Sequence, residues 1–296
     1  MTYQLFVEKV CTQLNLILDG SVYAEPHTSL KNNNISRIGI TITNPEINIS
    51  PTMYIEDFYE QYKDGCSIHD IAVRILEVYD EIRFDHSWDL SDIIDFESIS
   101  GKIAYKLIHF EKNRPFLQTV PHLRYQDLAI VFFLFIEIDC DDSGTILITN
   151  EMMHSWDVTI DTLYHYAAYN TKLLFPAEFK PMCAVICDML GTACSHQDFL
   201  DDHMYVLTNS ENQFGAATLL YDDLLEDIGS HLQDDYYILP CSIHELIIIP
   251  RRFSPSVSDL SAMVSEVNET ELSKDEFLTN QIYYYSRIHN TLLFTS

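Results

Sequence analysis

The chain has 296 residues, of which 47% are hydrophobic and 12% aromatic, so it can build a hydrophobic core and is too apolar for a disordered chain. Seventeen Lys and Arg against 45 Asp and Glu give a formal net charge of −28. That charge argues against nucleic acid and anionic membranes as ligands, because both are bound through clustered Lys and Arg. A basic protein partner fits the charge, and so does a purely solubilising role.

The N-terminal region, residues 1–120, is predicted to be mostly helical. Apolar residues recur at steps of three or four from Phe6 to Ile17, which indicates an amphipathic helix. Ser67 is expected to cap a later helix, with Asp70 in its first turn. Similar spacing predicts helices at 51–62 and 99–110, and alternation of apolar and small residues predicts a strand at 38–42.

Residues 121–296 are predicted to be an α+β region with a mainly antiparallel sheet. The apolar run 128–136 suits a strand buried on both faces, and 145–149 returns as its hairpin partner. Thr159 is expected to cap a helix that Pro176 ends. Further strands are predicted at 204–208, 216–221, 236–239, 245–249 and 283–285, and further helices at 182–190, 224–232 and 257–267. Hairpins alternating with helices favour an α+β fold, and the whole chain fits either two regions or one continuous domain.

The stretch 181–250 contains twelve Asp and Glu and no Lys or Arg. It also carries clear strand and helix patterns, so it is expected to be a folded module with an acidic surface. If this charge is functional, the sequence places the partner surface at Asp222, Asp223, Asp234 and Asp235. Replacing these four residues by Asn is then expected to abolish capture of the partner.

The cysteine content predicts reduced thiols in a cytoplasmic protein. There are seven cysteines, an odd number, and residues 1–18 carry acidic and polar residues that do not suit a secretory signal. The most apolar run, 128–136, is about half the length that a membrane span needs. We therefore expect no transmembrane segment.

One group of cysteines has a spacing that a metal site can use. Cys183, Cys187, Cys194 and His196 follow the pattern C-x3-C-x6-C-x-H, and the first two would share one face of a helix. Zinc sites more often use C-x2-C pairs, and cysteine is a common small buried residue. Buried structural thiols are the favoured interpretation, and no cofactor is predicted.

A second group could support nucleophilic catalysis. Ser242, His244 and Glu245 place a hydroxyl, an imidazole and a carboxylate within four residues. Catalytic partners usually come from separate elements, and the chain has no G-x-S-x-G motif. A turn in which Ser242 and His244 satisfy backbone groups is therefore the favoured interpretation.

Six ordered segments carry a family resemblance: PTMYIEDFYEQY from position 51, DLAIVF from 127, NTKLLFPAEFKP from 170, MYVLTN from 204, GAATLLY from 215 and LPCSIHELIIIP from 239. Together they resemble an uncharacterised family of gut Firmicutes proteins, catalogued as domain of unknown function 5688. The resemblance spans nearly the whole chain. It implies a bacterial, intracellular protein and brings no activity, cofactor or catalytic residue.

The leading hypothesis is a non-enzymatic cytoplasmic protein that binds a macromolecular partner, possessing an acidic surface suited to a basic protein. The first alternative is a hydrolase that uses Ser242, His244 and Glu245, which requires His244 to face a concave pocket beside a carboxylate. The second is an acidic mimic of nucleic acid, which requires the carboxylates to form one elongated stripe. The sequence leaves all three open.

Overall fold

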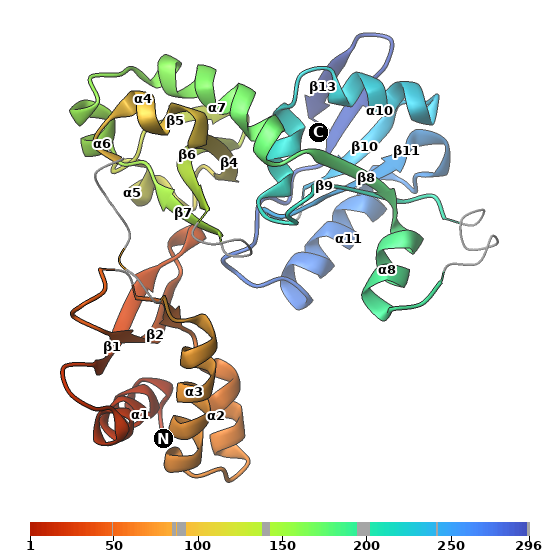
Figure 1. Cartoon of the computed structure of the whole chain (residues 1–296). Coiled ribbons are helices and arrows are strands. Elements are labelled where there is room, and N and C mark those ends of the chain that lie inside the picture. The colour runs from red at the N-terminus through yellow and green to blue at the C-terminus, as the bar shows by residue number, and fades with distance from the viewer. Residues whose placement is uncertain are drawn as a thin grey trace. The chain divides into compact units, whose positions relative to one another are not determined.

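The computed structural model describes residues 1–48, 50–84, 87, 93–137, 143–193, 202–240 and 242–294 (Figure 1). The chain forms two compact units. Unit 1 comprises Met1–Lys31 and Ile35–Asp92, and unit 2 comprises Asn32–Asn34 and Ile93–Ser296. This boundary does not coincide with the predicted division near residue 120, because β4 (Ile103–His109) pairs along its whole length with β6 (Leu128–Glu137) inside unit 2.

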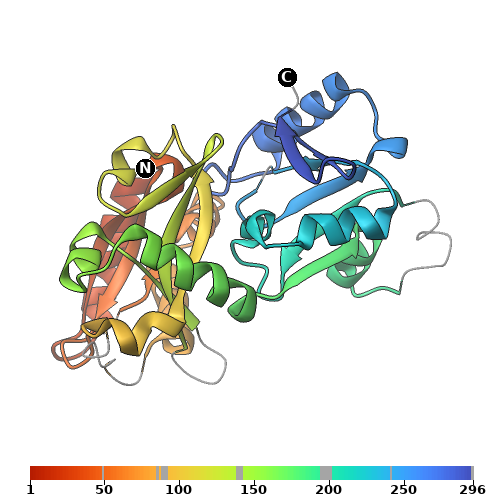
Figure 2. The same ribbon diagram turned by 90° about the horizontal axis from the view of Figure 1, so that it is seen from above.

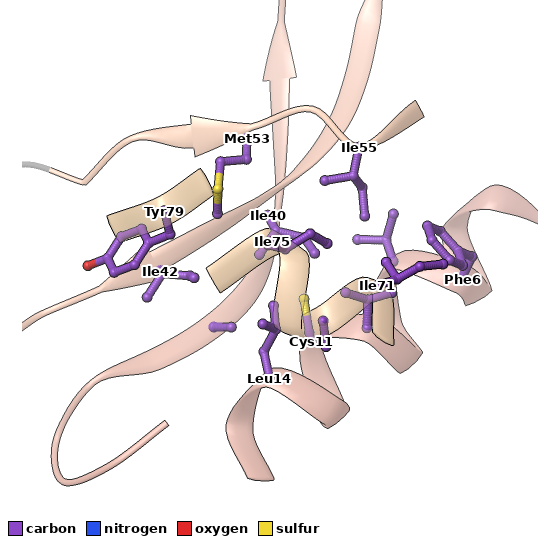
Figure 3. Close-up of a cluster of buried hydrophobic side chains, with 14 residues drawn as sticks. Phe6, Cys11, Leu14, Ile40, Ile42, Met53, Ile55, Ile71, Ile75 and Tyr79 are labelled. Atoms are coloured by element: carbon purple, nitrogen blue, oxygen red, sulfur yellow. The ribbon is translucent and has the colours of Figure 1, made fainter. Parts of the chain in front are cut away.

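Unit 1 packs helices on a small antiparallel sheet with the order β1-β2-β3. Its core, shown in Figure 3, joins Phe6 and Leu14 of the first helix to Ile40 of β2 and Ile75 of the third helix, and all four are 0% exposed. Ser67 caps the third helix by accepting a hydrogen bond from the Asp70 N–H, as predicted. The elements are α1 (Tyr3–Ile17), β1 (Tyr23–Leu30), β2 (Ser36–Thr43), β3 (Thr52–Met53), α2 (Glu56–Lys63) and α3 (Ile68–Ile82).

Unit 2 begins with a four-stranded antiparallel sheet in which β6 is central. β4 lies along one edge of β6, and β5 and β7 follow one another along the other edge. The prediction of a helix at 99–110 is wrong: β4 occupies 103–109, and its residues are buried on both faces. The remaining elements here are α4 (Phe96–Ile99), α5 (Arg114–Leu117), β5 (His122–Tyr125), β7 (Ser143–Leu147), α6 (Asn150–Ser155) and α7 (Ile160–Leu174).

The second sheet of unit 2, here the C-terminal sheet, has six antiparallel strands in the order β13-β12-β10-β11-β9-β8. Helix α10 covers one face, and α8 and α11 lie on the other, below the strands in Figure 1. Figure 2, seen from above, shows α10 in front of the strands. The elements are β8 (Ala177–Pro181), α8 (Met182–Leu190), β9 (Tyr205–Asn209), α10 (Leu224–Leu232), β10 (Tyr236–Leu239), β11 (Leu246–Pro250), α11 (Val257–Thr270), β12 (Tyr283–Ser286) and β13 (Thr291–Phe294).

The fold is therefore α+β, with antiparallel pairing throughout the described strands. The predicted strand at 216–221 is wrong, because Gly215–Leu220 forms a 3₁₀ helix. Its apolar run is buried like a strand but packs beside β9, with the Ala216 N–H bound to the Ile243 carbonyl. Within the described part of the chain, none of the helices has the length and hydrophobicity to cross a membrane.

Candidate functional site

The floor of the candidate site is one face of the C-terminal sheet, where three strands present alternate residues. In the strand register Glu178 lies opposite Thr208, and Val206 lies opposite Ile247. Side chains two residues apart in a strand share a face, so β8 adds Lys180 to the same surface. This floor mixes charged, polar and apolar side chains where a closed core would be apolar.

Helix α8 forms one wall of the site. Pro181 precedes it and has no side-chain group to cap it, so the Asp202 carboxylate takes that role. This carboxylate accepts hydrogen bonds from the Cys183 N–H at 2.6 Å and the Met204 N–H at 3.0 Å. The helix ends at Gly191, whose φ of 62° is left-handed. Both ends of α8 are thus fixed by local chemistry, and its range matches the sequence prediction.

The apolar side chains of α8 are only lightly covered. No residue of this helix is buried, although its sequence is MCAVICDML. Ile186 is 48% exposed, Met189 is 83% exposed and Leu190 is 71% exposed. A helix that is hydrophobic around most of its circumference normally lies in a core, so the exposure of these apolar side chains is unusual.

Between α8 and the floor lies a cavity of about 610 Å³. A second cavity of about 280 Å³ adjoins it under α11, and Met182, Glu245 and Ile247 line both. We call the two cavities together the α8–α11 groove. The remaining lining residues are Glu178, Lys180, Val185, Asp188, Met189, Val206, Thr208 and Asn212 in the larger cavity and Met204, Leu239, Met263, Val264, Val267 and Leu272 in the smaller.

Glu245 stands at the junction of the two cavities, partly buried among apolar side chains. Burial raises the pKa of its carboxyl above the ordinary value, and the nearby Glu276 acts in the same direction. His244 and a hydrogen bond with the Ser242 side chain oppose this rise in pKa. Among the described residues, no Lys or Arg forms an ion pair with Glu245. The groove therefore holds a carboxylate whose charge is poorly compensated.

The proposed nucleophilic group is only partly brought together. Ser242 is 2% exposed, and its Oγ accepts a hydrogen bond from the His244 N–H at 2.9 Å. The His244 ring stacks on Phe214 with the ring centroids 5.9 Å apart, and its Nδ1 accepts from the Phe214 N–H at 3.4 Å. Ser242 and Glu245 interact, but the His244 ring is directed at Phe214. The turn geometry expected from Ser242 and His244 is present.

The cysteine group is only partly described. Cys183 and Cys187 lie on α8, whereas Cys194 and His196 lie outside the described residues. Cys187 is disulfide-bonded, which corrects the expectation that all seven cysteines are reduced. A disulfide sulfur is no thiolate ligand, so Cys187 does not offer the zinc ligand that the spacing suggested. In the described ranges, no cluster of three or more His, Cys, Asp or Glu is arranged to hold a metal ion.

The four aspartates of the predicted partner surface have different surroundings. Asp235 is 17% exposed, and its carboxylate accepts hydrogen bonds from the Tyr284 hydroxyl at 2.5 Å and the Arg287 N–H at 3.0 Å. The Tyr284 hydrogen bond lowers the pKa of this carboxyl, helped by the Arg287 N–H and by the Arg251 charge. Asp234 is 20% exposed and accepts from the Arg252 N–H at 2.9 Å. These two aspartates are structural.

Asp222 and Asp223 are exposed, and Asp222 pairs with Lys172 at 2.6 Å. The fold thus brings basic side chains from outside 181–250 onto its acids, which a count along the sequence does not reveal. The α8–α11 groove was not predicted from the sequence. Two features could have indicated it: the alternation of Glu178, Phe179 and Lys180 along a strand, and the lack of a polar face in α8.

A comparison with protein families finds one that covers nearly the whole chain. The model of the family described as "Family of unknown function (DUF5688)" matches residues 3–287. Searches of the curated proteins and of the solved structures found no match. The match agrees with the six segments that carried the resemblance, and it leaves the geometry of the site as the guide to function.

Proposed function

We propose that this chain, which belongs to DUF5688, a family of unknown function, is a binding protein whose α8–α11 groove receives a segment of a partner protein. The observation that carries the proposal is the open, apolar wall of the groove. Met189 is 83% exposed beside a cavity of about 610 Å³, and no residue of α8 is buried. Covering such a surface is favourable by about 25 cal/mol for each Å² of apolar area removed from water.

The composition of the groove favours a flexible recognition surface over a reaction site. Four methionines line the groove, namely Met182, Met189, Met204 and Met263. Unbranched thioether side chains adapt to irregular partners, which is why methionine is frequent at binding surfaces that accept apolar segments. The Ser242 hydroxyl and the His244 ring, which a hydrolase would align, have separate partners.

The proposal is tested by capturing partners from the native host with the full-length tagged chain. Met189→Lys places a charge on the wall of the groove without disturbing a buried residue. Leu173→Lys is the matched control, because Leu173 is 62% exposed on α7 and lines neither cavity of the groove. We expect Met189→Lys to lose a stoichiometric partner that wild type and Leu173→Lys both retain. Equal recovery by all three proteins would contradict the proposal.

The exposed pair Asp222 and Asp223 is the rival surface, since it retains the acidic character that the sequence suggested. Asp222→Asn with Asp223→Asn tests it without touching the structural contacts of Asp234 and Asp235. We expect this double variant to keep the partner. Loss of the partner from this variant alone would move the binding surface to Asp222 and Asp223.

A further inference from the structure

The α8–α11 groove has two chemically distinct halves. The larger cavity contains the carboxylates of Glu178, Asp188 and Glu245 and one lysine, Lys180. Lys180 is already paired with Glu178, with its Nζ 2.7 Å from the carboxylate. Asp188 and Glu245 therefore leave an excess of negative charge in this half, which attracts a cation.

The smaller cavity is almost entirely apolar. Its lining consists of Leu, Ile, Val and Met side chains, with Glu245 as the only ionisable residue among the described lining. At about 280 Å³ it has room for one large apolar side chain. Two of its walls come from Met204 and Met263, which can adjust to the shape of that side chain.

Glu245 lines both cavities. A ligand that fills the groove therefore needs a cation for the larger cavity and, close to it, an apolar group for the smaller one. Residues three or four apart in a helix lie about 5–6 Å from each other, and residues two apart in a strand share a face. A single short segment can therefore place one side chain in the apolar cavity and another against Glu245. A cation there would also relieve the cost of keeping the carboxylate partly buried.

We infer that the partner segment bound in the α8–α11 groove carries a lysine or arginine close to a large apolar residue, with the cation at Glu245 and the apolar side chain in the smaller cavity. This inference rests on the proposed function and names the chemistry of the partner. Charge complementarity selects a basic segment over an acidic one, and the apolar cavity selects against a purely basic tail.

The test is selection of a random dodecapeptide library on the full-length protein, followed by affinity measurements on the enriched peptides. Clones are counted as groove-dependent when Met189→Lys loses them and Leu173→Lys keeps them. We expect the groove-dependent peptides to share a Lys or Arg within four positions of Phe, Leu, Ile, Met or Trp. Enrichment of acidic or uncharged peptides, or the absence of any groove-dependent peptide, would overturn the inference.

Fluorescence anisotropy with a labelled consensus peptide then locates the cation. Glu245→Gln is expected to weaken binding about tenfold, which corresponds to about 1.4 kcal/mol. Asp222→Asn is the control and is expected to leave the affinity unchanged. The affinity should also fall as pH falls through the pKa of Glu245, because the protonated carboxyl no longer attracts the cation. Equal affinity of wild type and Glu245→Gln would overturn the assignment.

The two proposals can fail separately. If Met189→Lys loses the host partner while Glu245→Gln and added salt have no effect, the groove binds a partner of different chemistry. If Met189→Lys keeps the host partner, the groove itself is not the binding site.

Discussion

Neighbouring residues of β11 point to opposite faces of the C-terminal sheet and meet very different surroundings. Ile248 faces α10 and is 0% exposed, whereas Ile247 faces the α8–α11 groove and is only partly buried. The α10 face is closed: Leu207, Tyr236, Ile238, Leu246 and Ile248 are all 0% exposed. The opposite face is divided: Leu239, Ile249 and Ile282 are at most 4% exposed where they pack with Leu260 and Val264 of α11, and the sheet remains accessible beside α8, where the groove lies.

The largest expected loss of stability comes from truncating a side chain on the closed α10 face. Ile248→Ala removes a fully buried side chain and leaves a cavity, so we expect the free energy of unfolding to fall by about 3–4 kcal/mol. Ile247→Ala is the matched change one residue away and is expected to cost about 1 kcal/mol, because its site is already open. Urea denaturation of both variants measures the difference. Equal losses would mean that the two faces are equally packed.

Gly215 tests the packing where the 3₁₀ helix meets β9. A Cβ at this position would lie 2.2 Å from both the His244 carbonyl oxygen and the Thr208 Oγ1, so the backbone must move. We expect Gly215→Ala to lower the free energy of unfolding by about 2–3 kcal/mol. Gly101→Ala is the control, because a Cβ there meets no atom within 4 Å. It should change stability by less than about 0.5 kcal/mol.

Asp235 tests whether the acidic stretch is structural. Asp235→Asn weakens the charge-assisted hydrogen bonds from Tyr284 and Arg287, and we expect a loss of about 2 kcal/mol at pH 7. Because the pKa of Asp235 is lowered by folding, its contribution is present above the pKa of the unfolded chain and disappears as pH falls through the lowered value. Melting curves of wild type and variant should therefore converge in acid.

The matched control for Asp235 is Asp222→Asn, since Asp222 is 80% exposed in its pair with Lys172. An exposed ion pair of this kind contributes between zero and about 1 kcal/mol. If Asp222→Asn were as destabilising as Asp235→Asn, the division between structural and exposed acids would be wrong.

The smallest expected effect is a gain in stability. Burial raises the pKa of Glu245, so its ionised form is disfavoured in the folded chain, and the resulting loss of stability appears as pH rises through the window between its unfolded and folded pKa. We expect Glu245→Gln to raise the melting temperature at pH 7 by about 1–2 °C, and this gain should vanish once pH falls below the ordinary pKa of an unfolded glutamate. A lower melting temperature at pH 7 would show that the carboxylate is structural.

The sequence predicted those elements whose hydrophobic pattern fits only one type of secondary structure. Helix α8 was predicted over 182–190 with its end at Gly191, and β6 was predicted from its continuous apolar run. The segment 99–110 failed because apolar residues on both faces of a buried strand also fit helical spacing. The site could not be assembled from sequence, because Glu178 and Glu245 become neighbours of one cavity only through the strand order β8-β9-β11. Likewise, the side chains and backbone N–H that bind the Asp235 carboxylate belong to Arg251, Tyr284 and Arg287, which lie outside the acidic stretch 181–250.

The most direct test of the central claim is hydrogen–deuterium exchange of the full-length chain with and without the captured partner. We expect the partner to slow exchange in α8 and in the C-terminal half of α11, where Met263, Val264 and Val267 line the groove, and to leave residues 222–235 unchanged. Protection confined to residues 222–235 would contradict it and return the binding surface to the exposed aspartates.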